Sequence, residues 1–283
     1  MKIIVHGGAG SSPDDPDKRQ EILNEAAEQG AEANTPLDAI ETAINILEAS
    51  PKFNAGFGSA IQADKTIRTD AGIMTSNREV GAVCSVKGVQ ETVSLARVVL
   101  EETPHILISC DSAVALAEDF DIETGMDLLT EEQRDKLADM DIPTGSPKNQ
   151  LEYISQNFGG SDTVGAVAYD GKQFVAGTST GGRWLSLPGR VGDVPQVGAG
   201  FYASSAGAAS TTGAGEDIAK VTLTRRAVGY LEDGKSAQSA AEFALRDFED
   251  MTDSTAGLIV MDTNGTYGTE FNSEAMQTSQ VME

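Results

Sequence analysis

The chain has 283 residues, of which 40% are hydrophobic and 5% aromatic, and its 44 acidic and 20 basic side chains give a net charge of −24. This length suits one large domain or two small ones and allows a sizeable core. The charge argues against nucleic acid and anionic membranes as partners, because both repel a strongly acidic protein. A surface of this kind is typical of halophilic proteins, whose self-repulsion is screened by salt.

The two cysteines, Cys84 and Cys110, are too few for a disulfide framework, and no Cys/His cluster in the sequence indicates zinc. Both lie in apolar stretches, which predicts buried free thiols. The apolar run of the N-terminal sequence MKIIVHGGAG is too short for a signal peptide, and no segment is long enough to span a bilayer. We therefore expect a cytoplasmic enzyme or binding protein.

The N-terminal half alternates strand-like and helical patterns. A buried strand is expected at 2–5, followed by a glycine turn at 7–10, and further strands are expected at 67–74 and 79–86. Helices are expected at 17–33, 36–49, 91–102 and 112–120. In the second of these helices, Ile40, Ile44 and Leu47 recur at helical spacing, which predicts one buried face.

The segment 121–160 has a different, polar composition. Thr130 to Gln133 form a capping box, and Pro143, Gly145 and Pro147 follow. These features predict a surface excursion that becomes loose before Gly159 and Gly160.

The C-terminal half returns to dense strands. Strands are expected at 163–169, 173–178 and 196–202, helices at 216–231 and 236–247, and a final hairpin at 257–262 and 266–271. Asp170-Gly171 and Asn264-Gly265 are turn dipeptides. Because the strands come in two sets with helices grouped between and after them, the order predicts an α+β layered sandwich with mainly antiparallel pairing.

The two histidines, His6 and His105, leave little room for histidine-based hydrolysis. The sequence contains no GxSxG elbow to supply a triad serine, no clustered metal ligands and no GxxxxGK[ST] phosphate loop. We interpret both histidines as structural residues.

An N-terminal amine can activate a hydroxyl nucleophile without histidine. Its ordinary pKa of about 7.7–8.0 leaves a useful fraction as free base near neutrality. Thr163 opens a predicted strand after a glycine-containing stretch and directly follows Asp162. Its hydroxyl could attack the Asp162 carbonyl, shift the acyl group from nitrogen to oxygen and leave an ester for water. Taken alone, however, this stretch favours an ordinary strand residue.

A series of downstream motifs changes that interpretation. The series is TVGAVAYD at 163–170, TSTGG at 178–182, LPGRVGD at 187–193, VGAG at 197–200 and TTGAGE at 211–216. The first half adds HGGAG at 6–10, FNAG at 53–56, SLAR at 94–97 and TPH at 103–105. In order and spacing, this series resembles the plant-type L-asparaginase/isoaspartyl peptidase family of N-terminal-nucleophile hydrolases, and the resemblance covers nearly the whole chain.

The resemblance implies a single hydrolase domain, 1–283, with the four-layer αββα sandwich of these hydrolases. It implies self-cleavage between Asp162 and Thr163 into an α subunit, 1–162, and a β subunit, 163–283. Thr163 would then be the nucleophile and its freed amine the base.

Other site residues follow from the same resemblance. Thr180 matches the residue that orients the nucleophile, and Thr212 and Gly213 match the donors that hold the oxyanion. Asn54 matches a residue that lines the site from the first half.

Arg190 matches the residue that binds the substrate α-carboxylate. Asp193 matches the acceptor for the α-ammonium group, assisted by the Gly215 carbonyl. Independently of the family, an Arg and an Asp three residues apart on a Pro/Gly loop can bind the two opposite charges of an amino acid. Without its neighbours, the pair would be interpreted as a surface ion pair. We call Arg190 and Asp193 the clamp.

The expected reaction is hydrolysis of L-asparagine or of β-aspartyl (isoaspartyl) dipeptides to L-aspartate through an acyl-enzyme on Thr163. Asp162 stands where many relatives have glycine, and the stretch 69–76 lacks their Met-Asp-Gly ending, so the substrate stays open. The alternatives are a glycosylasparaginase, a taspase-like endopeptidase, or a non-catalytic small-ligand binder with the same fold.

The resemblance also bears on cofactors and partners. It implies no organic cofactor, and a sodium ion held by main-chain carbonyls near Phe53, Ala55 and Phe57. It implies a homodimer of processed αβ protomers.

Overall fold

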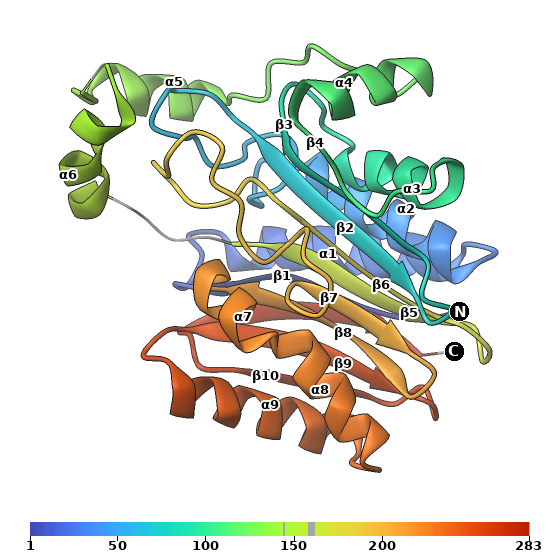
Figure 1. The fold of residues 1–283 in the computed structure, drawn as a ribbon. Helices are drawn as coiled ribbons and strands as arrows, with labels where there is room; N and C mark the ends of the chain where they lie inside the picture. The colour runs from blue at the N-terminus through green and yellow to red at the C-terminus, as the bar shows by residue number, and fades with distance from the viewer. Residues whose placement is uncertain (144, 158–161, 283) are drawn as a thin grey trace.

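The computed structural model of the protein describes residues 1–143, 145–157 and 162–282, and its strands form two sheets (Figure 1). The larger sheet has the strand order β11-β1-β5-β6-β2-β3-β4, and the smaller has the order β10-β9-β8-β7. The larger sheet consists of β1 (Lys2–Gly10), β2 (Thr69–Thr75), β3 (Val80–Val86), β4 (Ile108–Ser109), β5 (Val164–Tyr169), β6 (Phe174–Thr180) and β11 (Ala275–Val281). The smaller consists of β7 (Phe201–Ser204), β8 (Gly207–Gly213), β9 (Ala256–Asp262) and β10 (Tyr267–Phe271).

Neighbouring strands run antiparallel except at the β3–β4 edge, which is parallel. The prediction of a mixed helix-and-strand fold with mainly antiparallel pairing is therefore confirmed. The two sheets pack against each other through one apolar cluster, to which Ile4 and Val167 contribute from the larger sheet and Phe201 and Ile259 from the smaller.

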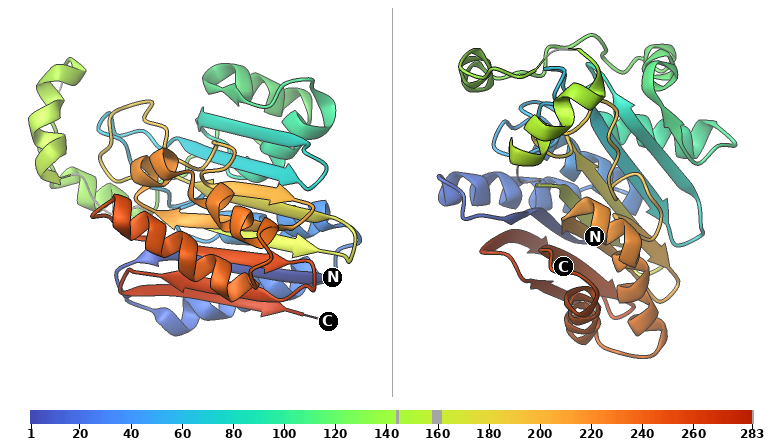
Figure 2. Two further views of the ribbon diagram at one scale, coloured as in Figure 1. Left: turned by 60° about the horizontal axis from the view of Figure 1, so that its bottom comes forward. Right: turned by 60° about the vertical axis from the view of Figure 1, so that its left-hand side comes forward.

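Helices cover the outer faces of both sheets (Figures 1 and 2). The larger sheet is covered by α1 (Pro16–Ala31), α2 (Pro36–Glu48) and α3 (Thr92–Glu102), with α4 (Cys110–Asp119) beside β3. The smaller sheet is covered by α8 (Leu223–Glu232) and α9 (Ala237–Met251), and α7 (Gly215–Val221) follows β8. As predicted, Ile40, Ile44 and Leu47 of α2 are all buried in the core.

The excursion after α4 is more ordered than its composition indicates. It contains α5 (Glu131–Ala138) and α6 (Pro147–Asn157), which lie at the upper left of Figure 1. The capping box at the start of α5 is confirmed, because Thr130 and Gln133 exchange both reciprocal hydrogen bonds. Leu137 and Ile154 attach the two helices to the body through a cluster with Ile61 and Leu185. The expected loosening at Gly159 and Gly160 lies outside the described residues.

Several element predictions were wrong where tertiary contacts override local preference. The strand β1 continues through the expected glycine turn, because β11 pairs with Ala9 and Gly10 beyond a bulge. Neither β8 nor β11 was predicted; β8 (GAASTTG) has few strand-forming residues and is held by partners on both sides. The expected helix 216–231 is two helices, since Thr222 adopts a left-handed conformation, φ 56°. The expected strand at 196–202 becomes regular only at Phe201.

The prediction of two buried thiols is half wrong. Cys84 is buried in β3, whereas Cys110 is exposed at the first turn of α4. The apolar stretch before Cys110 ends at the sheet edge, so it does not carry the thiol into the core. Among the described helices, none is long and apolar enough to cross a membrane.

Candidate active site

Thr163 lies immediately before β5, in the middle of the larger sheet, and is only 3% exposed. Its backbone N–H donates to Oγ1 of Thr212 in the smaller sheet at 3.3 Å. The N–H of Ala9 donates to the same oxygen at 3.1 Å. The Thr212 hydroxyl group therefore accepts two backbone donors and still has its own hydrogen to donate. It links the two sheets at the point where Thr163 lies.

The carbonyl oxygen of Asp162, which precedes Thr163, accepts two side-chain hydrogen bonds. Asn54 donates from Nδ2 at 2.8 Å, and Thr180 donates from Oγ1 at 3.1 Å. Asn54 is itself held in place, because its Oδ1 accepts from the N–H of Ala60 at 2.7 Å and its Nδ2 also donates to the Gly182 carbonyl at 2.7 Å. Two fixed donors on one carbonyl oxygen would stabilise negative charge on that oxygen. The sequence placed Asn54 at the site but did not indicate this contact.

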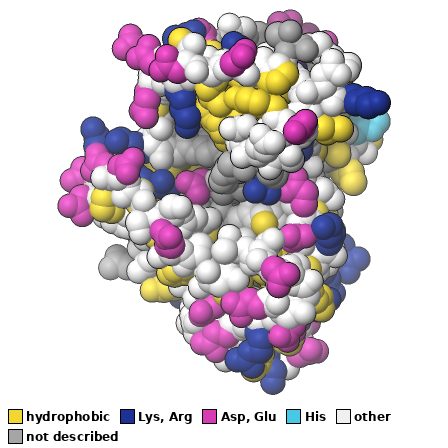
Figure 3. Space-filling view, turned by 90° about the vertical axis from the view of Figure 1, so that its left-hand side faces the viewer, with side chains coloured by type: hydrophobic (Ala, Val, Ile, Leu, Met, Phe, Trp, Pro, Cys, Tyr) yellow, Lys and Arg dark blue, Asp and Glu magenta, His cyan; other side chains and the backbone are white. Residues whose placement is uncertain are grey.

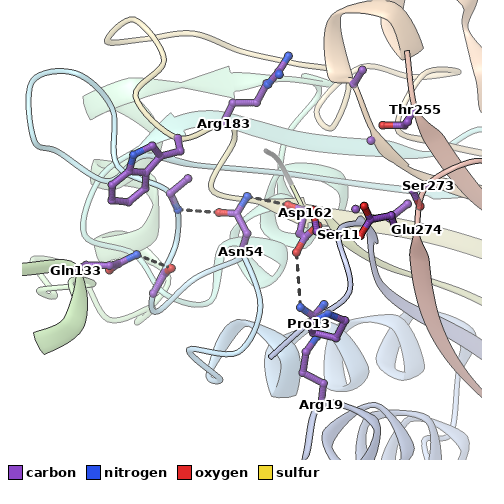
Figure 4. A pocket seen from close by; sticks show the side chains of 17 residues that line it. Ser11, Pro13, Arg19, Asn54, Gln133, Asp162, Arg183, Thr255, Ser273 and Glu274 are labelled. Atoms are coloured by element: carbon purple, nitrogen blue, oxygen red, sulfur yellow. Dashed lines mark hydrogen bonds and ion pairs between the residues drawn. The ribbon is translucent and has the colours of Figure 1, made fainter. Parts of the chain in front are cut away.

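The side chain of Asp162 is 33% exposed at the cavity wall and lies beside a basic residue. Its Oδ2 is 3.6 Å from Nη1 of Arg19 in α1, and Figure 4 shows Arg19 and Asn54 approaching Asp162 from two sides. Burial raises the pKa of the Asp162 carboxyl group, and the positive charge of Arg19 opposes that rise. A Cβ atom at Gly8 or Gly10 would lie 2.8 Å from the Asp162 side chain, so the HGGAG stretch must be glycine-rich here. The sequence contains no local signal that assigns Arg19 to the site.

Arg190 forms a two-pronged ion pair with Glu216 at the start of α7. Its Nε and Nη2 donate to the two carboxylate oxygens of Glu216 at 2.7 and 2.8 Å. Burial would raise the pKa of Glu216, but the hydrogen bonds from Arg190 outweigh it, so the pKa lies below its ordinary value. Glu216 belongs to the TTGAGE motif, but the sequence gave it no role. Among the described residues, the carboxylate to which Arg190 donates hydrogen bonds is therefore that of Glu216 and not that of Asp193.

Asp193 is a buried carboxyl group with an unpartnered oxygen. It is 4% exposed, and its Oδ2 makes no hydrogen bond within the described part of the chain. Burial raises the pKa of Asp193 to about 6. A Cβ atom at Gly215 would lie 2.5 Å from Oδ1 of Asp193, so only glycine allows this approach. A buried carboxylate left without a partner is unfavourable, and a cationic ligand would relieve it.

Asn54, Thr180 and Thr212 thus come together around the Asp162–Thr163 bond. Arg190 lies beside this group at Gly182, where an added Cβ atom would be 3.4 Å from Nη1 of Arg190, and the Gly182 carbonyl accepts from Asn54. Thr180 and Thr212 lie at the ends of β6 and β8, and Gly213 closes β8. A cavity of about 620 Å³ opens over this region, and Asn54, Asp162 and Gly213 contribute to its wall. The same wall contains Arg19, Gln133, Arg183, Trp184, Thr255 and Glu274 (Figure 4). Acidic side chains are spread over the molecular face shown in Figure 3, which agrees with the scattered acidic residues of the sequence.

The structural interpretation of the histidines agrees with their surroundings. His6 is fully buried, and its Nε2 lies 2.8 Å from Oγ of Ser210. Burial lowers the pKa of His6 to about 3, so the ring is neutral at pH 7. Its Nδ1 has no partner among the described residues, so no acidic group orients the ring as a triad would require. His105 is exposed in a turn after α3.

The loop after α2 offers oxygen ligands from the main chain. The carbonyl groups of Asn54 and Gly58 accept hydrogen bonds. The carbonyl groups of Phe53, Ala55 and Phe57 accept none within residues 1–143, 145–157 and 162–282. Such oxygens suit a hard cation. In the same described ranges, no group of three His, Cys, Asp or Glu side chains could hold a metal ion.

The sequence profile described as asparaginase matches residues 1–283, which is the whole chain. The chain belongs to the asparaginase family. Within this family it is 38% identical to a plant-type L-asparaginase of Pyrococcus furiosus, over 98% of the chain and 94% of that protein. It is 38% identical to a plant-type L-asparaginase of Thermococcus kodakarensis, over 97% of the chain and 94% of that protein. It is 37% identical to an isoaspartyl peptidase/L-asparaginase of Macaca fascicularis, over 97% of the chain and 91% of that protein. The family resemblance expected from the motifs is confirmed.

Proposed function

We propose that this asparaginase-family protein is an amidohydrolase that releases L-aspartate from L-asparagine, from β-aspartyl dipeptides, or from both. Its relatives carry the names L-asparaginase and isoaspartyl peptidase. The observation that carries the proposal is the buried carboxyl group of Asp193, three residues from Arg190, whose Oδ2 has no hydrogen-bond partner among the described residues. A ligand that carries both an ammonium and a carboxylate group would give the Asp193 oxygen a partner and would bring its carboxylate to the Arg190 guanidinium, of which Glu216 holds Nε and Nη2.

The active form is proposed to arise by self-cleavage within a four-layer αββα sandwich. The Thr163 hydroxyl group attacks the carbonyl carbon of Asp162, and the Asp162 oxygen takes negative charge between Asn54 and Thr180. The proton of the hydroxyl group passes to the Thr163 nitrogen, the C–N bond breaks, and the Asp162 acyl group is left as an ester on Thr163 Oγ1 beside the freed amine. Water hydrolyses this ester, so the chain divides into 1–162, ending in a carboxylate, and 163–283, beginning with a free amine.

Asn54→Ala is expected to slow this maturation. It removes one of the two donors to the Asp162 oxygen, and loss of one such donor slows comparable reactions by about 10²- to 10³-fold. The rate is measured by electrophoresis as the conversion of the 283-residue chain into its two fragments. Asn45→Ala is the matched control, because Asn45 also bridges two elements, through Ser94, but lies on α2 away from Asp162. Equal maturation rates of the Asn54 variant and the control would rule out the donor role.

In the processed enzyme, the free amine of Thr163 would take the proton from its own hydroxyl group. The oxygen then attacks the side-chain amide carbonyl of the substrate, while Thr180 orients it. The Thr212 hydroxyl group, already fixed by Ala9, and the Gly213 N–H would hold the oxyanion. The amine leaves with a proton, and water hydrolyses the acyl-enzyme to L-aspartate. Arg190 and Asp193 would bind the α-carboxylate and the α-ammonium, with the Gly215 carbonyl as a second acceptor.

Two further features belong to this proposal. The carbonyls of Phe53, Ala55 and Phe57 would hold a sodium ion, whose charge would stiffen the loop that carries Asn54. Processed protomers would pair as a homodimer. Such pairing would cover exposed apolar side chains such as Ile106 and Leu107, which directly precede the edge strand β4.

The function is tested by assaying the purified protein with L-asparagine, a β-aspartyl dipeptide and glycosylasparagine side by side. We expect release of L-aspartate from at least one of the first two substrates by protein that has matured into two fragments. Turnover of glycosylasparagine alone would assign the protein to the other branch. Failure of all three substrates with fully cleaved protein would refute the proposed function.

A further inference from the structure

The peptide bond between Asp162 and Thr163 is held from three directions. Its N–H donates to a side-chain oxygen of the smaller sheet, and its carbonyl oxygen accepts from two side-chain donors. The third contact is an ion pair of the Asp162 side chain, whose Oδ2 lies 3.6 Å from Nη1 of Arg19 on α1. The proposed maturation uses the first two contacts and gives the ion pair no role.

The guanidinium group of Arg19 also contacts two segments that hold this bond. Its Nη2 donates at 2.7 Å to the Gly7 carbonyl of β1, two residues before the N–H that donates to Thr212. Its central carbon lies 4.8 Å from the centre of the Phe53 ring, in a cation–π contact, and Phe53 directly precedes Asn54. A Cβ atom at Gly7 would lie 2.7 Å from Cε1 of Phe53, so glycine allows the strand and the loop to meet beside Arg19.

The stability of the fold does not explain the ion pair. The Arg19 side chain is only 12% exposed, and its Nε makes no hydrogen bond among the described residues. A buried donor without a partner is destabilising. The Asp162 side chain is 33% exposed, and an ion pair with a partly exposed partner contributes little to stability. What the pair does provide is a fixed direction for the Asp162 side chain.

A fixed side chain limits the movement of the Asp162 backbone. The side chain is anchored by Arg19 on one side, and the carbonyl oxygen is anchored by Asn54 and Thr180 on the other. The carbonyl carbon between these anchors therefore keeps its position relative to the Thr163 hydroxyl group. Reactions between held groups depend strongly on such placement, since a displacement of about 1 Å can slow them by about 10²-fold.

We infer that Arg19 is a positioning residue for self-cleavage: through its ion pair with the Asp162 side chain, it holds the Asp162 carbonyl group in place for attack by the Thr163 hydroxyl group. This inference rests on the proposed self-cleavage of the chain. Arg19 acts through the Asp162 side chain and not on the bond that breaks. Its contacts with Gly7 and Phe53 keep the guanidinium group where the ion pair forms.

Arg19→Gln is expected to slow maturation by about tenfold or more, because the Asp162 side chain loses its charged anchor. Arg19→Lys keeps the positive charge and should mature at least about threefold faster than Arg19→Gln. The rate constant is measured by electrophoresis after synthesis in a cell-free translation mixture, as the conversion of the full chain into its two fragments.

A double-mutant cycle with Asp162→Ala distinguishes positioning through Asp162 from a general effect on the fold. Asp162→Ala removes the carboxylate and should slow maturation by itself. Adding Arg19→Gln should then change the rate by less than about twofold. Arg226→Gln is the matched control, because Arg226 also donates to one backbone carbonyl and pairs with one aspartate, Asp247, but lies on α8. It should mature at the wild-type rate.

The outcomes separate the two proposals. If the wild-type chain is not cleaved before Thr163, the proposed self-cleavage fails before Arg19 is tested. If wild type is cleaved and Arg19→Gln matures at the same rate, the inference is overturned. Equal slowing by Arg19→Gln with and without the Asp162 carboxylate would overturn it too, because Arg19 would then act on the fold and not through Asp162.

The lysine variant decides the remaining cases. If Asp162→Ala is not cleaved at all, the cycle cannot be completed, and an Arg19→Lys rate no higher than that of Arg19→Gln overturns the inference. Insolubility of both Arg19 variants overturns it as well, because Arg19 would then be required for folding and not specifically for the scissile bond.

Discussion

Thr163→Ala is expected to leave the protein as an intact 283-residue chain without hydrolytic activity. The substitution removes the hydroxyl group proposed both to cut the chain and to attack the substrate, and without the cut no free amine forms at residue 163. Loss of a catalytic nucleophile lowers kcat by about 10⁴-fold or more. Electrophoresis measures the first effect, and L-aspartate release measures the second.

Thr163→Ser is the control for this result. It keeps the hydroxyl group and removes only a methyl group, so it should still divide into fragments 1–162 and 163–283 and retain activity. N-terminal sequencing of the smaller fragment should begin at residue 163. A Thr163→Ala protein that is cleaved at this bond, or that hydrolyses the substrates at the wild-type rate, would contradict the proposed mechanism.

Asp193→Asn is expected to mature normally but to lose substrate binding. Removing one partner of a buried charge pair costs about 2–5 kcal/mol, which corresponds to a fall in kcat/KM of roughly 30- to 4,000-fold. The defect should appear chiefly in KM, because Asp193 is proposed to contact the α-ammonium group and not the reacting bond. Steady-state kinetics with the best substrate of the panel measure it.

Because the pKa of Asp193 is raised, we expect KM to depend on pH in the weakly acidic range. Below about pH 6 the free carboxyl group is protonated and neutral, so it no longer attracts an ammonium group, and KM should rise as the pH falls. Above that pH the carboxylate is charged and binding is restored. In Asp193→Asn, KM should no longer rise as the pH falls. Asp170→Asn, which changes an aspartate in an exposed turn, is the control and should keep the rise. A wild-type KM that is unchanged from pH 7 to pH 5 would exclude Asp193 as the ammonium acceptor.

The elements with strong local patterns could be predicted from the sequence. The helix at α2 was predictable because Ile40, Ile44 and Leu47 repeat at helical spacing, and the capping box at the start of α5 because it is a local contact, although the helix itself was not predicted. In contrast, β8 could not be predicted. Its Gly, Ala, Ser and Thr residues have weak strand preference, and the strand forms because β7 and β9 hold it on both sides.

The candidate site likewise could be predicted from the sequence only in part. The motif order around Thr163 was enough to indicate the family and to select Asn54, Thr180 and Thr212, which form hydrogen bonds with Asp162 or Thr163 in the structure. The contacts between these residues could not be predicted from the sequence. Asn54 reaches the Asp162 carbonyl across 108 residues of chain, and Arg190 reaches Glu216 across 26. Such contacts depend on strand register and loop placement, which no local pattern specifies.

The sequence by itself determined the class of fold, the family and the residue types available for chemistry, because periodicity and motif spacing are local properties of the chain. Only the tertiary structure decided which charges are paired. It gave Arg190 a carboxylate partner in Glu216 and left one oxygen of Asp193 without a hydrogen-bond partner among the described residues. The physical reason is that the pKa and pairing of a buried group depend on its desolvation and on the neighbours that packing brings to it.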